Sequence, residues 1–150
     1  DIQHEAMAEL NLSEILLATG DFREALAMCE KARECFEEID HRLGLADAYR
    51  ILGCVWTQEK KGKPAVACFE KSIALNRDTG YRLGEAEACR DYARFLQDRG
   101  NTTPSIELFS RARAIFSNLG IEREIHDIDK MMEKVRVFPS SDASQYSFAV

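Results

Sequence analysis

The sequence predicts an all-α fold, a right-handed α-solenoid of three antiparallel helix pairs plus a C-terminal capping helix. Three observations support this fold class. An internal repeat recurs at an offset of 40 residues, and within each half of the repeat apolar residues stand three and four apart. The composition is 45% hydrophobic and 31% charged with only 3 Pro and 8 Gly, which is typical of a helix-rich domain.

The repeat is visible first in its turns, because EIDHRLG begins at Glu38, DTGYRLG at Asp78 and NLGIERE at Asn118. Small residues also hold fixed places in the second half of each unit: Ala25, Ala65 and Ser105, then Ala32, Ser72 and Ala112. Bulky residues stand between them: Cys29, Phe69 and Phe109. Small side chains are needed where two helix axes approach within about 8–10 Å, so this pattern predicts closely packed helix pairs.

The first helices of the three pairs are expected at about 3–19, 43–60 and 83–98, and the second helices at about 22–38, 64–77 and 103–118. The units then span about 3–40, 43–80 and 83–120. Breaks within the pairs are predicted at Gly20, Gly62 and Gly100. Pro64 and Pro104 fit a first helical turn, and Thr102 or Thr103 is expected to cap the last second helix.

A further amphipathic helix over 121–136 is predicted to cover the open end of the stack, so the repeat domain would comprise residues 1–136. Residues 137–150 have the composition of a tail or linker. We expect this tail to dock on a groove, either of its own chain or of a neighbouring copy. The alternative is a passive linker. The chain begins at Asp1, and the helical spacing of apolar residues is already present in its first ten residues. We therefore expect the chain to be a segment of a longer protein, with or without further repeats before it.

The unit resembles a tetratricopeptide repeat, whose signature is one small residue in the first helix and two in the second. Ser13, Gly53 and Ala93 occupy the first small position. The period of 40 is similar to that of a long-helix variant found in bacterial signalling and transcription regulators. The resemblance covers about residues 5–120. It implies a scaffold that binds a peptide or protein in a concave groove, as a regulatory segment of a larger signalling protein.

The resemblance also implies that the first helix of each pair lines this groove. The expected groove residues are Met7, Leu10, Glu14, Leu17, Asp47, Arg50, Thr57, Gln58, Glu87, Arg90, Arg94, Gln97 and Asp98. The N-terminal third of this predicted groove is apolar and the remainder is polar. Its apolar end would instead belong to a core if further repeats preceded it.

Three arginines of the predicted groove, Arg50, Arg90 and Arg94, favour an acidic peptide or a C-terminal carboxylate as the ligand. In a second interpretation these arginines pair within the chain. Asp47 would then bind Arg50 and Glu87 would bind Arg90, or Arg50 would bridge to Glu87. A second function class is self-assembly without a separate peptide ligand.

Other functions find little support in the sequence. The formal net charge of -6 disfavours nucleic acid, and no apolar run approaches the about 20 residues of a membrane span. No cofactor or metal site is expected, because the three histidines and five cysteines lack ligand spacing, and no nucleophile stands near an oriented base. Five cysteines without a C-x-x-C pair favour free thiols, so we expect a cytoplasmic, non-enzymatic protein.

Overall fold

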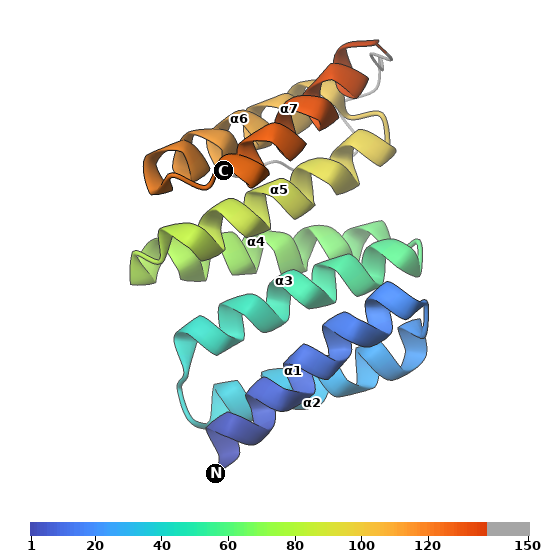
Figure 1. Ribbon diagram of the computed structural model, residues 1–150. Helices are drawn as coiled ribbons and strands as arrows, with labels where there is room; N and C mark the ends of the chain where they lie inside the picture. The colour runs from blue at the N-terminus through green and yellow to red at the C-terminus, as the bar shows by residue number, and fades with distance from the viewer. Residues whose placement is uncertain (138–150) are drawn as a thin grey trace. The chain divides into compact units, whose positions relative to one another are not determined.

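The computed structural model describes residues 1–137, including the side chains of residues 1–134, and this part of the chain contains helices and no strand (Figure 1). The helices are α1 Ile2–Thr19, α2 Phe22–Glu38, α3 Arg42–Gln58, α4 Gly62–Thr79, α5 Arg82–Asp98, α6 Thr102–Leu119 and α7 Glu122–Val137. The all-α prediction is confirmed. Apart from Val137, the predicted tail 137–150 and its docking lie outside the described residues.

The helices fall into two compact units. Unit 1, Asp1–Gly80, holds α1 to α4, and unit 2 starts at Tyr81 and holds α5 to α7. In unit 1, α2 packs against both α1 and α3, α1 also lies next to α3, and α4 packs on α3. In unit 2, α6 packs against α5 and α7 in the same way. Each unit is therefore built from neighbouring antiparallel helices, as the repeat predicts. None of the described helices is long and apolar enough to cross a membrane.

A residue with left-handed backbone ends each of the first six helices, once every twenty residues. These residues are Gly20, Asp40, Lys60, Gly80, Gly100 and Gly120, with φ values of 90, 51, 59, 70, 77 and 73°. The residue after each of the first five is the N-cap of the next helix, which begins one residue later. For this reason the break predicted at Gly62 lies at Lys60, and the cap predicted at Thr102 or Thr103 is Asn101. Pro64 and Pro104 lie in first helical turns, as expected.

The small residues of the repeat lie where the two helices of a pair come closest. In the first pair the Ser13 hydroxyl donates to the Ala25 carbonyl at 2.8 Å, and in the third pair the Ser105 hydroxyl donates to the Ala93 carbonyl at 2.9 Å. These four residues are fully buried, so each hydroxyl exchanges water for a carbonyl of the partner helix. The close approach therefore requires a small residue on both helices, while the hydroxyl group comes from either helix.

Candidate ligand-binding surface

The apolar end of the predicted groove is smaller in the structure than in the sequence analysis. Leu10 is only 1% exposed and belongs to the core of unit 1 with Phe36 and Leu52, so its assignment to the groove surface was wrong. Leu17 is half-buried and packs against the same core. Met7 is 36% exposed and is the residue of the three that a ligand could reach readily. The apolar part of this surface in unit 1 is therefore narrow.

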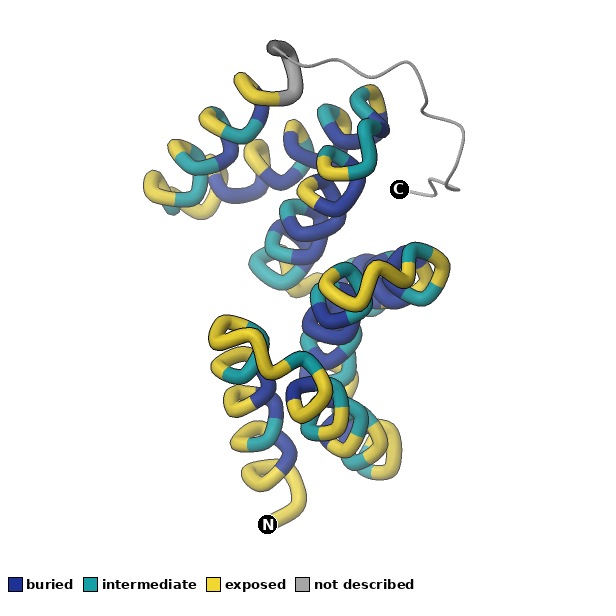
Figure 2. The backbone as a smooth tube through the Cα atoms, turned by 90° about the vertical axis from the view of Figure 1, so that its right-hand side faces the viewer, coloured by how far each residue is buried: buried dark blue, intermediate teal, exposed yellow. Residues whose placement is uncertain are grey.

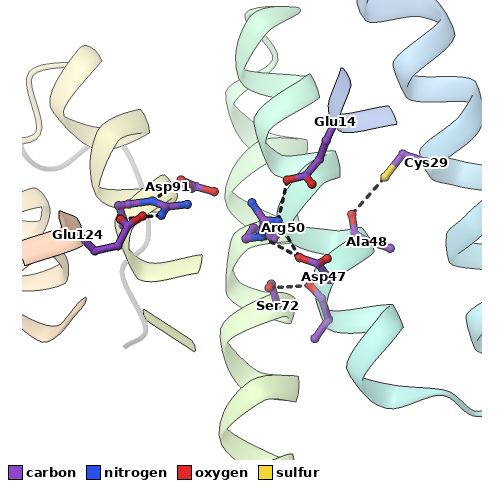
Figure 3. Close-up of polar contacts among 10 residues, drawn as sticks. Glu14, Cys29, Asp47, Ala48, Arg50, Ser72, Asp91 and Glu124 are labelled. Atoms are coloured by element: carbon purple, nitrogen blue, oxygen red, sulfur yellow. Dashed lines mark hydrogen bonds and ion pairs between the residues drawn. The ribbon is translucent and has the colours of Figure 1, made fainter. Parts of the chain in front are cut away.

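Arg50 joins the exposed sides of α1 and α3 (Figure 3). Its Nη2 donates to Oε1 of Glu14 at 2.9 Å, and its Nε donates to Oδ1 of Asp47 at 2.8 Å. The Arg50 side chain is 10% exposed, whereas those of Glu14 and Asp47 are 48% and 41% exposed. Two carboxylates surround one guanidinium, so the cluster presents net negative charge to solvent.

The remaining predicted groove residues of unit 1 lie near the end of α3. The half-buried Thr57 donates its hydroxyl to the carbonyl of Gly53 at 2.8 Å, one turn back on the same helix. Gln58 is exposed and is the last residue of α3. Thr57 therefore has its donor engaged within its own helix, while the Gln58 amide faces solvent.

Arg90 makes the corresponding contacts in unit 2. Its Nη1 donates to Oε2 of Glu124 on α7 at 2.9 Å, and its Nε donates to Oδ1 of Asp91 at 3.0 Å. Burial of Arg90 favours its neutral form, but Asp91 and Glu124 outweigh this effect and hold the Arg90 pKa above its usual value. Arg90 is therefore a charged, paired group that ties α5 to α7.

Arg94 lies one turn beyond Arg90 on α5 and differs from it in environment. Arg94 is exposed and forms no ion pair with any side chain of residues 1–134. Its neighbours from the predicted groove are the half-buried Glu87, the exposed Asp98, and Gln97, whose Nε2 donates to the Met131 carbonyl of α7 at 2.9 Å. Of the three arginines expected to clamp a carboxylate, Arg94 is the one that a ligand can reach without displacing a bond.

The pairing of Arg50 with Asp47 is one of the alternatives drawn from the sequence, and the structure contains it. The partners from neighbouring helices, Glu14 on α1 and Glu124 on α7, were not predicted from the sequence. Glu14 precedes Arg50 by 36 residues, and Glu124 follows Arg90 by 34. Spacings near the repeat length are a signal that could have indicated such contacts between successive units.

The groove residues of unit 1 lie within the region that a comparison with protein families identifies. A family model described as tetratricopeptide repeat matches residues 4–78, which is half of the chain. A search of curated proteins finds no match to this sequence.

Proposed function

Because the chain belongs to the tetratricopeptide repeat family, we propose that it is a protein-interaction module whose first helices hold a peptide or a partner protein. Repeats of this family mediate protein–protein interaction. The described residues supply side chains suited to that task, since exposed polar groups and the exposed Met7 are among the predicted groove residues of the first helices.

The observation that carries the ligand assignment is the exposed guanidinium of Arg94. Arg50 and Arg90 already bind two carboxylates each, so a ligand carboxylate would have to displace bonds of 2.8–3.0 Å to use them. Arg94 has no such competitor among the side chains of residues 1–134. A charge-assisted hydrogen bond to an arginine contributes about 1.5–3 kcal/mol, so one carboxylate at Arg94 can strengthen binding by about tenfold or more.

The surrounding charges favour a single carboxylate over an acidic run. Asp98 stands one turn after Arg94, and Glu124 and Asp91 lie beside the preceding arginine. A peptide with several acidic residues would be repelled by these groups, because like charges at close range cost free energy. We therefore assign to this surface a peptide with a free C-terminal carboxylate and few other acidic residues.

The experiment selects peptides from a library of octapeptides displayed with free C-termini and measures a selected peptide by calorimetry. Amidation of its C-terminus is expected to weaken binding by about tenfold, and Arg94→Gln should cause the same loss. Arg23→Gln, the same change at an exposed arginine of α2, is the control and should leave the affinity unchanged. Equal affinity of the free and amidated peptides would reject the carboxylate, and failure of any peptide to bind would reject peptide binding itself.

A further inference from the structure

An apolar stripe on α1 has no helix covering it within residues 1–137. Leu12 is 43% exposed and Ile15 is 60% exposed, and Ala8 is exposed beside them. Their spacing of four and three places all three on one face of the helix. Figure 2 shows exposed residues recurring along one side of this helix, directly after the N-terminus. The stripe faces away from the core that α1 forms with α2 and α3.

The corresponding stripe on α3 is buried. Positions 40 residues later than Ala8, Leu12 and Ile15 are Ala48, Leu52 and Val55, which are 0%, 1% and 0% exposed. α2 lies against this side of α3, where the Cys29 thiol donates to the Ala48 carbonyl at 3.3 Å (Figure 3). The same stripe on α3 is thus part of a helix–helix interface.

Unit 2 contains a second example of this interface. Ile128 and Met132 of α7 stand at the same repeat positions as Ala8 and Leu12, and they are 0% and 8% exposed. Here α6 packs against α7. In both units the second helix of a pair, α2 or α6, covers the stripe of the helix that follows it. The equivalent stripe on α1 therefore has the shape and the apolar character of a helix-binding surface.

Charge around α1 indicates what kind of helix fits. Residues 1–40 contain eleven acidic and three basic residues, whereas residues 41–80 contain four acidic and seven basic ones. α1 itself has no Lys or Arg, and Glu5, one turn before Ala8, has a side chain that is 78% exposed. In unit 2 the covering helix supplies the matching cation, since Nε of Arg113 on α6 donates to Oδ1 of Asp129 on α7 at 2.7 Å. A helix with basic residues beside its apolar face would complement α1 in the same way.

We propose that the Ala8–Leu12–Ile15 stripe docks an amphipathic helix of a partner protein that carries Lys or Arg along its flank. This surface is separate from Arg94 and lies in the other unit. α2 and α6 of a second copy are each already packed between two first helices, so neither is free to cover the stripe.

The test uses a designed helical peptide of Leu, Ala and Lys as long as α1, with its leucines three and four apart, and a matched peptide in which Glu replaces Lys. We expect fluorescence anisotropy to show binding of the Lys peptide to the full chain. Replacing both Leu12 and Ile15 by Ser should weaken binding at least about tenfold, as expected for central apolar contacts. Glu5→Lys should weaken the Lys peptide and strengthen the Glu peptide.

Two controls test whether the effect is specific to the stripe. Leu43→Ser removes a comparably exposed leucine of α3, and Glu38→Gln removes an exposed carboxylate of α2, and neither should change the affinity. Circular dichroism checks that each variant keeps its helices. Unchanged binding after the double substitution, or equal binding of both peptides, would overturn the proposal. Light scattering that shows self-association of the chain, lost in the double variant, would overturn it in favour of a second copy.

Discussion

Gly53 faces Phe69 across the second helix pair, and adding one methyl group there tests how tightly the pair is packed. An ideal Cβ at Gly53 would lie 2.6 Å from Cε1 and 2.7 Å from Cδ1 of Phe69, well inside the usual contact distance of about 3.5–4.0 Å. Phe69 is 1% exposed, so its ring cannot turn into solvent. Gly53→Ala therefore forces the two helices or the ring to move.

Two opposing contributions set the size of the effect. Overpacking a well-packed core costs about 1–3 kcal/mol, while replacing glycine by alanine inside a helix contributes about 1 kcal/mol. The net expectation for Gly53→Ala is a loss of about 0–2 kcal/mol in the free energy of unfolding. If Phe69 is first shortened by the substitution Phe69→Leu, the ring no longer obstructs a Cβ at position 53, and only the higher helix propensity of alanine remains. In that background Gly53→Ala should become stabilising by up to about 1 kcal/mol.

Urea denaturation followed by circular dichroism measures all four members of this double-mutant cycle. The coupling energy between positions 53 and 69 should fall in the range of about 0.5–3 kcal/mol found for contacting residues. Ala93→Gly is the matched control, because Ala93 holds the same repeat position opposite Phe109 and should lose about 1 kcal/mol. If Gly53→Ala stabilised the wild-type chain as much as it stabilises the Phe69→Leu variant, the close contact would be refuted.

Three further predictions concern the turns, the small positions and a buried thiol. Lys60→Gly should raise the free energy of unfolding by about 1 kcal/mol, because Lys60 has φ 59°. Gly20→Ala should lower it by a similar amount although a Cβ there meets nothing within 4 Å, and thermal melting compares the two. Ala32→Leu or Ala112→Leu should destabilise by about 1–3 kcal/mol, since both residues are 0% exposed, and an unchanged melting temperature in both would disprove the assigned register. Burial raises the pKa of Cys29 from 9.0 to about 12, so above pH 9 the unfolded chain loses a proton that the folded chain keeps. Stability should then fall by about 1.4 kcal/mol per pH unit from pH 9 towards 12, and denaturation of Cys29→Ala across that range should show less of this fall.

Local features of the sequence determined most of the helix boundaries. Each turn needs a residue with left-handed backbone, a conformation that glycine adopts without steric cost. Glycine occupies this position in four of the six turns, so these four are visible in the sequence. The turn at Lys60 was not predicted, because a lysine gives no such signal and the next glycine, Gly62, suggested a break there instead. The small positions were predictable for a related reason. Ser13 lies on the first helix of its pair and Ser105 on the second helix of its pair, but both lie at the same close approach between paired helices.

The character of the candidate surface was decided by tertiary structure. Each residue turns a helix by about 100°, so a position at the edge of the apolar face, such as Leu10, is buried or exposed according to how neighbouring helices pack. One interpretation of the sequence had Arg50 offer its charge to a ligand and the other paired it with Asp47, but neither included Glu14, which lies 36 residues earlier and also binds Arg50. That contact depends on the distance between α1 and α3, which no local pattern encodes. The sequence thus determined the repeat, its helices and its close contacts, whereas only the packing of successive helices decided that Arg50 and Arg90 are paired and that Arg94 and the α1 stripe are exposed.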